Sequence, residues 1–375
     1  MLIKSITPLP VSLPMQKPVI MAGEEVRRAD NVLVRFETDG RRTSWGEAAA
    51  APVMTGETME SIVAAVHHLS AVLIGRDPGD IDGALRAMIG RLYGNQGAKA
   101  AIEIAIYDIA AQAAQCPVHA LLGKKLRDRM PLLGVVGGGD LAGDLDDAAK
   151  KKADGFAIYK IKVGVDTPEQ DAARSRAICE VLGHDVLISA DANQGFSREE
   201  ALAYVRAVKG AGLSFFEQPL EAHDLDGMAK VAASTSIAIG ADEGIHSLAD
   251  IRAHHAAKAA RGVSLKAIKL GGIRALSQAG ALCAELGMAV NISCKTGESS
   301  VACAAALHAA CVIPAVAWGV TMTHTALAAD VTRTPVPTAR GHVEALDRIG
   351  LGVEVNEDLI ERHRVRIVQR TIQSG

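Results

Sequence analysis

Three acidic residues recur at nearly equal intervals through the second half of the chain. Asp191, Glu217 and Asp242 lie about 25 residues apart, and each ends a short apolar run. This interval is roughly one strand–helix unit, so it predicts three carboxylates at the same height on neighbouring parallel strands. A single acid there would be interpreted as a helix cap or a lysine partner, but three in register repel each other unless a cation lies between them. Oxygen ligands of this kind suit Mg²⁺ or Mn²⁺.

Lysines precede and follow these acids. Lys160 and Lys162 lie in the sequence KIK, one unit before Asp191, and Lys266 lies one unit after Asp242. Alternation along a strand places Lys160 and Lys162 on the same side. Counted along the chain, the strands that carry Lys162 and Lys266 are the second and the sixth. We therefore expect these two lysines to face each other and to act as acid and base.

Acids and lysines together indicate removal of a proton from the carbon next to a carboxylate. Loss of this proton places a second negative charge on the carboxylate oxygens, and a bound cation stabilises the resulting enediolate. In this interpretation the acids hold the cation and the lysines move the proton. The sequence thus predicts a metal-dependent enzyme that acts on a small carboxylate.

The elements that must position these residues form a repeating pattern. Helical stretches at 168–182, 198–210, 223–234 and 272–287 alternate with short apolar runs, which is typical of an α/β (β/α)8 TIM-like barrel. The eight predicted strands are residues 131–135, 156–162, 186–191, 213–217, 236–241, 263–269, 288–293 and 315–319.

The first third of the chain has a different pattern. Residues 2–14 and 30–38 alternate like antiparallel strands, and residues 97–115 form a strong helix. Residues 16–29 and 45–57 are predicted as loops. We therefore predict an α+β capping domain over 1–125, a catalytic barrel over 126–345, and a segment over 346–375 that returns to the capping domain.

Composition restricts the classes of partner. Apolar residues make up 49% of the chain and the formal net charge is −3 with both signs mixed, which favours a soluble enzyme without nucleic acid or a membrane as partner. The N-terminus contains prolines and lacks the apolar core of a signal peptide. The six cysteines show no metal spacing, so we expect a reduced, cytoplasmic setting. We also expect a homo-oligomer.

The motifs resemble those of the enolase superfamily, in particular the mandelate racemase/muconate lactonizing enzyme group and its muconate lactonizing subgroup. The resemblance runs through almost the whole chain and is specific only in combination. It rests on WGEAAAAP and TGET near the N-terminus, on KIK, DAN, FFEQP and GADE, on Lys266 followed by Gly271-Gly272, and on the acidic turn at Glu298.

The resemblance implies a role for each matching residue. Asp191, Glu217 and Asp242 would bind Mg²⁺, with Mn²⁺ as an alternative. Lys162 and Lys266 would be the acid/base catalysts, and Lys160 would give electrostatic support. Residues 16–29 and 45–57 would close over the substrate and select it. Further substrate-binding or supporting residues would be Asn193, Glu298, Lys295 and Thr321.

The overall reaction stays open at this point. An isomerase, either a cycloisomerase or a racemase/epimerase, is the leading hypothesis, and a dehydratase acting through the same enediolate is its alternative. A Schiff-base aldolase and a non-catalytic binding protein are more distant alternatives, because neither explains three acids in register. The segment around Thr321 carries no acid to hold a substrate ammonium, which argues against a dipeptide epimerase. The segment before Glu298 also differs from the usual muconate cycloisomerase pattern.

Overall fold

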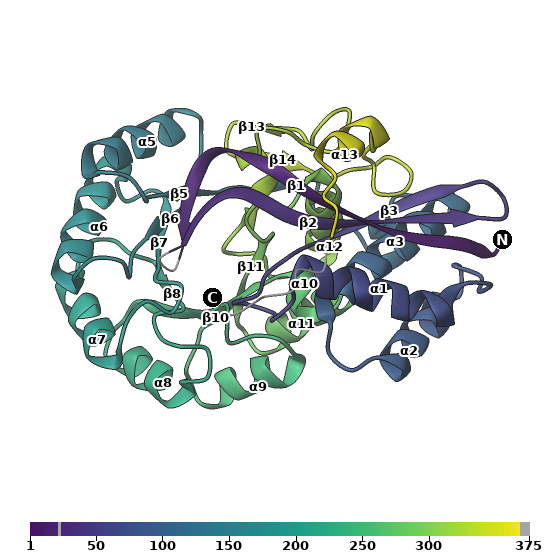
Figure 1. Ribbon diagram of the computed structural model, residues 1–375. Helices are drawn as coiled ribbons and strands as arrows, with labels where there is room; N and C mark the ends of the chain where they lie inside the picture. Colours follow the sequence, from purple (N-terminus) through teal and green to yellow (C-terminus); the bar gives the residue numbers. More distant parts are fainter. Residues whose placement is uncertain (22–23, 368–375) are drawn as a thin grey trace, which may run out of the picture.

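The computed structural model describes residues 1–21 and 24–367, arranged as a capping domain beside a barrel (Figure 1). The capping domain has an antiparallel sheet in the order β1-β2-β3, and the predicted helix at 97–115 is confirmed as α3. Its elements are β1 (Ile3–Met21), β2 (Glu24–Thr38), β3 (Thr43–Ala49), α1 (Met59–Leu73), α2 (Ile81–Arg91), α3 (Gln96–Ala114) and α4 (His119–Leu122).

The barrel confirms the predicted fold class. Eight parallel strands follow the order β5 to β12, and the bridge between Leu132 and Val320 brings the two ends of this sheet together in a nearly closed ring. The strands are β5 (Leu133–Val136), β6 (Ile158–Lys162), β7 (Leu187–Asp191), β8 (Phe215–Glu217), β9 (Ala238–Ala241), β10 (Gly262–Leu265), β11 (Ala289–Ser293) and β12 (Val320–Thr321).

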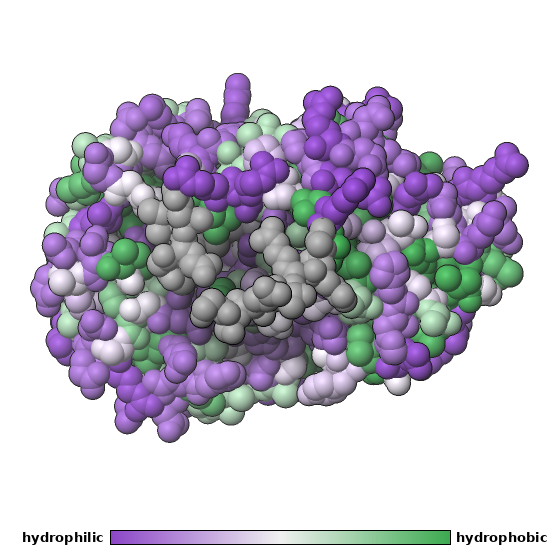
Figure 2. Space-filling view, in the orientation of Figure 1, coloured by the Kyte–Doolittle hydropathy of each residue, from purple (hydrophilic) through white to green (hydrophobic). Residues whose placement is uncertain are grey.

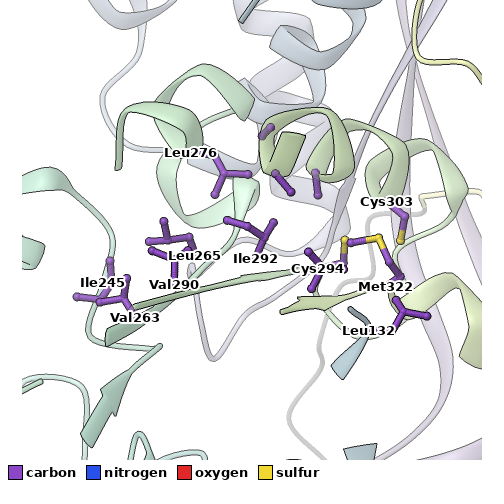
Figure 3. Packing of buried hydrophobic residues seen from close by; sticks show 14 of the residues in the cluster. Leu132, Ile245, Val263, Leu265, Leu276, Val290, Ile292, Cys294, Cys303 and Met322 are labelled. Atoms are coloured by element: carbon purple, nitrogen blue, oxygen red, sulfur yellow. The ribbon is translucent and has the colours of Figure 1, made fainter. Parts of the chain in front are cut away.

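Helices surround this ring (Figure 1). Figure 3 shows how the layers pack: Leu265 of β10 and Ile292 of β11 lie beside Leu276 of α11. Such burial of aliphatic side chains between strands and helices provides most of the stabilisation of the barrel. The helices are α5 (Leu141–Ala153), α6 (Pro168–Leu182), α7 (Arg198–Ala207), α8 (Leu225–Ala233), α9 (Leu248–Ala256), α10 (Ala267–Leu270), α11 (Ile273–Glu285) and α12 (Ser300–Val312).

Aromatic packing fills the amino-terminal end of the barrel. Trp318 stacks on Phe215 with ring centroids 3.9 Å apart. Gly262 leaves room for this indole, since a Cβ there would lie 2.3 Å from it. The prediction of the eighth strand at 315–319 is therefore wrong. Trp318 belongs to the aromatic packing at the amino-terminal end of the barrel. Gly319 forms a turn with a φ of 68°, and β12 begins only at Val320.

The segment 16–29, predicted as a loop, is strand wherever the structure describes it. β1 and β2 continue through it as the two arms of a long hairpin, and residues 22–23 lie outside the described part. Figure 1 shows this hairpin extending from the capping domain across the barrel. Contacts with the barrel hold it there: Ala328 N donates to Pro14 O over 2.8 Å, and Asn31 Nδ2 donates to Gly297 O over 2.7 Å.

The second predicted loop, 45–57, also needs correction. Its first five residues belong to β3, and only the remainder is turn. Glu47 on β3 accepts hydrogen bonds from the backbone N–H groups of Ser299 (2.9 Å) and Ala302 (3.0 Å) at the start of α12. Burial raises the pKa of Glu47 to about 7, although the donors on Ser299 and Ala302 oppose the shift. The segment therefore joins the capping domain to the barrel.

The predicted strand 263–269 is shorter than expected. β10 ends at Leu265, and the chain turns directly into the short helix α10. Gly271 and Gly272 end this helix with positive φ values. Gly272 is required for a second reason, because a Cβ there would lie 1.8 Å from a carboxylate oxygen of Glu103.

The chain returns to the capping domain after the barrel. Val365 N donates to Pro10 O over 2.9 Å, and Val11 forms a β-bridge with Arg364. No helix in the described part of the chain is long and apolar enough to span a membrane. The remaining elements are β4 (Arg129–Pro131), η1 (Thr323–Ala326), β13 (Thr338–Ala339), β14 (His342–Glu344) and α13 (Glu357–His363).

Glu103 of α3 gives a testable pH dependence of stability. Its carboxylate accepts from Ile273 N and Arg274 N at the start of α11, and burial raises its pKa to about 8. The folded protein thus holds this proton more tightly than the unfolded chain, whose value is 4.5. The stability from this group is complete below pH 4.5 and is lost as the pH rises through 8.

We expect the thermal midpoint of the wild type to fall, relative to that of Glu103→Gln, between pH 5 and 9. The relative change should be on the order of a few degrees. Differential scanning calorimetry of both proteins measures it, with the exposed Glu60→Gln as control. Parallel midpoints for the wild type and Glu103→Gln across this range would contradict the assignment.

Candidate active site

A cavity of about 390 Å³ opens at the carboxyl end of the barrel strands. The view in Figure 2 shows the molecule hollowed between the barrel and the capping domain. Val19 from the hairpin and Met54 from the turn after β3 line the cavity from the capping domain. Eight of the predicted site residues line it from the barrel: Lys160, Lys162, Asp191, Asn193, Asp242, Lys266, Lys295 and Thr321.

Strand register brings the first predicted site residues together. Lys162 pairs with Asp191 across β6 and β7, and Asp191 pairs with Glu217 across β7 and β8. Lys162 Nζ lies 2.7 Å from Asp191 Oδ2, and Lys160 Nζ lies 2.7 Å from Glu217 Oε1. Lys160 also approaches Asp191 Oδ2 at 3.5 Å. Residues that are one strand–helix unit apart in the sequence are therefore in direct contact in the structure.

Asp242 lies between two lysines at the end of β9. Lys266 Nζ forms a close ion pair with Asp242 Oδ2, and Lys269 Nζ lies 2.6 Å from Asp242 Oδ1. Lys266 directly follows β10, four strands from β6 in the ring of eight, so it lies across the cavity from Lys162. The Lys269 side chain is fully buried and contacts a predicted metal ligand.

Asn193 connects Lys162 to a carboxylate that the sequence analysis missed. Asn193 Oδ1 accepts from Lys162 Nζ over 2.6 Å, while its Nδ2 donates to Glu243 Oε1 over 3.0 Å. Asn193 has a φ of 43°, a value that L-residues rarely adopt. The GADE motif contains Glu243, but only Asp242 fits the spacing of the other acids, so spacing alone gave no reason to select Glu243.

Burial and charge act against each other on the acids. Burial favours the neutral form of Asp191, but Lys162 and Lys160 outweigh it and lower the Asp191 pKa. Burial likewise opposes ionisation of Asp242, and Lys266 and Lys269 reverse the effect, so the Asp242 pKa is lowered. For Glu217 burial prevails, reinforced by the other two acids, and the Glu217 pKa is raised despite Lys160.

The same groups can be tested as cation ligands. In the described ranges, no group of three or more His, Cys, Asp or Glu side chains is arranged closely enough to hold a metal ion. Lysine ammonium groups contact the oxygens of the three acids instead. The donor set nevertheless suits a hard cation: three buried carboxylates end consecutive strands, and Glu217 Oε2 is buried without a hydrogen-bond partner. A divalent cation would supply the positive charge that the lysine ammonium groups now supply.

Of the remaining predicted substrate-binding or supporting residues, two line the cavity and one is buried behind its wall. Lys295 and Thr321 line the cavity, together with Cys294, whose sulfur lies near those of Met322 and Cys303 (Figure 3). Glu298 is buried and does not line the described cavity. Its Oε2 accepts from Lys295 N over 2.8 Å. Burial raises the pKa of Glu298 to about 8, so this carboxyl group is mainly protonated at neutral pH.

Comparison with known proteins follows the same division of the chain. Residues 5–123 match the model of the mandelate racemase/muconate lactonizing enzyme N-terminal domain, and residues 144–359 match the enolase C-terminal domain-like model. The chain is 31% identical to the N-succinyl-L-Arg/Lys racemase of Bacillus cereus, over 94% of this chain and 95% of that protein. It is 33% identical to the L-Ala-D/L-Glu epimerase of Bacillus subtilis, over 80% of this chain and 82% of that protein.

A solved structure gives the same result for the fold. The 2-chloromuconate cycloisomerase of Rhodococcus opacus superposes with a TM-score of 0.93 at 28% identity, covering 98% of this chain and 100% of that chain. Its barrel and capping domain therefore share their arrangement with those described above. These matches, together with the register of acids and lysines at the strand ends, show that the chain belongs to the mandelate racemase/muconate lactonizing enzyme family of the enolase superfamily, as an enzyme of the isomerase kind.

Proposed function

We propose that this isomerase acts on a small carboxylate through an enediolate. A racemase or epimerase forms it by removing the proton next to the carboxylate and then returns a proton to the same carbon. A cycloisomerase forms it when an internal nucleophile of the substrate adds to the conjugated double bond, and a proton is then added to the carbon next to the carboxylate; ring opening reverses these steps.

The observation that carries the proposal is the cavity itself, which Lys162 and Lys266 line from strands on opposite sides and Asp191 and Asp242 line from strands between them. A racemase, an epimerase and a cycloisomerase all share the enediolate intermediate and a proton transfer at the carbon next to the carboxylate. An N-succinyl amino acid racemase, a dipeptide epimerase and a chloromuconate cycloisomerase are among the chain's relatives.

In the proposed mechanism the chain's own residues hold the substrate carboxylate and move the proton. Asp191, Glu217 and Asp242 would hold Mg²⁺, or Mn²⁺ in its place, and when bound the cation would offset negative charge that develops on the carboxylate oxygens. Lys162 and Lys266 would each face one side of the carbon that loses its proton. They are the proposed acid/base pair.

Lys160 and Asn193 would support this pair. Lys160 contacts two proposed metal ligands, Glu217 and Asp191, so it is placed to supply fixed positive charge to both rather than to exchange protons with the substrate. Asn193 accepts a hydrogen bond from Lys162 and so fixes the direction in which that ammonium group points. Both arrangements favour a preorganised site.

The far end of the substrate would meet Lys295 and Thr321. Both line the cavity, and Met54 and Val19 add apolar surface from the capping domain. Glu298 would act indirectly, because it accepts a hydrogen bond from the Lys295 backbone rather than lining the cavity. We propose that these residues, with the hairpin and the turn after β3, select the substrate.

Hydrogen exchange in heavy water tests the proposal. The purified protein is incubated with small carboxylates, including N-acylamino acids, muconates, acid sugars and hydroxyprolines, and deuterium uptake is followed by NMR. We expect uptake at the carbon next to the carboxylate, lost after exhaustive chelation and restored by Mg²⁺. Net loss of water from a substrate would favour a dehydratase instead. Activity that survives chelation, with substrate trapped on a lysine by borohydride, would favour an aldolase.

Location and assembly belong to the same proposal. We propose a cytoplasmic enzyme, a setting supported by six cysteines that are all free thiols. We also propose a homo-oligomer, which analytical ultracentrifugation tests directly.

A further inference from the structure

Lys269 differs from the other lysines near the cavity in the way it is buried. It lies in the short helix α10, its side chain is 0% exposed, and it does not line the cavity. Its Nζ donates to Asp242 Oδ1 (2.6 Å), to Ser264 O (3.1 Å) and to the backbone carbonyl of Asp242. An ammonium group has three donors, and here each has an acceptor. The group is therefore fixed in one position.

The two oxygens of Asp242 have different surroundings. Oδ1 faces Lys269 in the closed interior, while Oδ2 pairs with Lys266, which lines the cavity. A carboxylate held at one oxygen by a fixed donor cannot rotate freely about its χ2 angle. Its second oxygen then points in a defined direction, toward the cavity.

We propose that Lys269 is a positioning residue that holds Asp242 by Oδ1, so that Oδ2 stays directed at the cation site when Lys266 leaves it to act on the substrate. This inference rests on the proposed function, because Asp242 is a metal ligand only in that mechanism. It assigns the two lysines separate roles. Lys269 keeps Asp242 paired at all times, and Lys266 is paired only until a cation takes its place.

Electrostatics alone predicts the opposite result from positioning. Removal of a positive charge beside a cation site reduces repulsion and should tighten metal binding. Loss of a partner that orients a ligand weakens metal binding on the order of 10- to 100-fold. The sign of the change therefore separates the two interpretations.

The experiment measures Mn²⁺ affinity without substrate, by electron paramagnetic resonance of the free ion. Lys269→Met keeps the chain length and removes the ammonium group, and we expect Mn²⁺ binding at least about tenfold weaker than in the wild type. Lys99→Met is the matched control. Lys99 is also buried, but its Nζ donates to Leu92 O in the capping domain. Its replacement should lower the thermal midpoint and leave Mn²⁺ affinity unchanged.

Unchanged or tighter Mn²⁺ binding in a folded Lys269→Met would overturn the inference. If this variant fails to fold, Lys269→Gln, which retains a donor of shorter reach, is judged by the same criterion. A parallel Mn²⁺ titration of Glu217→Gln tests the proposed metal site separately from the proposed role of Lys269. If Glu217→Gln binds Mn²⁺ as the wild type does, the proposed metal site fails. If it weakens binding and Lys269→Met does not, only the role of Lys269 fails.

Discussion

Replacing either of the proposed catalytic lysines, Lys162 or Lys266, should reduce α-hydrogen exchange by about 10²- to 10⁴-fold, the range expected for loss of a general acid or base. If the enzyme is a racemase or epimerase, Lys162→Ala should abolish exchange for one enantiomer and Lys266→Ala for the other. The reason is geometric: β6 and β10 are four strands apart in the ring, so the two ammonium groups approach a bound carbon from opposite sides. Exchange of each enantiomer in heavy water, followed by NMR, measures the effect.

A cycloisomerase gives a different pattern with the same variants. Only one of its lysines needs to touch the proton, and the other then serves as electrostatic support, so exchange would be lost mainly in one variant. Lys150→Ala is a suitable control, because Lys150 lies on the outer helix α5 and pairs with Asp146 in solvent. Near-normal turnover of an identified substrate by both single variants would refute the mechanism.

The placement of these side chains at the strand ends was largely predictable because a repeating unit fixes the height of each residue in a parallel barrel. Residues one strand–helix unit apart meet in register, as the pairing of Lys162 with Asp191 and of Asp191 with Glu217 shows. This register depends on the length of one strand–helix unit and not on the exact first and last residues of each strand. It therefore holds even where the predicted strand bounds were wrong by several residues. The common register also argues against interpreting each acid as a separate helix cap, because independent caps need not lie at the same height on neighbouring strands.

The hairpin could not be predicted for a physical reason. One proline, Pro18, and several charged residues in 16–29 weaken the local strand signal, and the contacts that hold the strand are distant in sequence. Ala328 bonds to Pro14, and Gly297 bonds to Asn31. A pattern read over a dozen residues contains no information about such partners, so tertiary structure overrides local propensity here.

The sequence analysis did not select Lys269 or Glu243, for a related reason. Alternation along an extended strand would place Lys269 on the opposite side from Lys266, away from Asp242. The chain instead turns into α10 after Leu265, and the helical turn returns Lys269 to the same carboxylate. For Glu243, the contact with Asn193 depends on the positive φ of Asn193, which the sequence does not reveal.

Glu217→Gln should lower the affinity for Mg²⁺ or Mn²⁺ at least about tenfold, because one of three anionic ligands becomes a neutral amide. The change is small in volume, so it tests charge rather than packing. Glu217 is fully buried, its Oε1 contacts Lys160 at 2.7 Å, and its Oε2 has no hydrogen-bond partner. That second oxygen is the one we expect a cation to take.

The matched control is Glu57→Gln, a buried acid in the capping domain that accepts from Gly97 N (2.7 Å) and Ala98 N (3.1 Å) at the start of α3. Removing its charge should change stability and leave metal binding unchanged. Calorimetric titration of Mg²⁺ into both variants gives the comparison, and the Glu217→Gln enzyme should need at least about tenfold more Mg²⁺ for half-maximal exchange. Equal affinities in the two variants, or full activity after exhaustive chelation of the wild type, would show that these acids serve the lysines alone. The same three carboxylates would then be a charge-balancing network, and proton removal would have to proceed without a cation on the substrate oxygens.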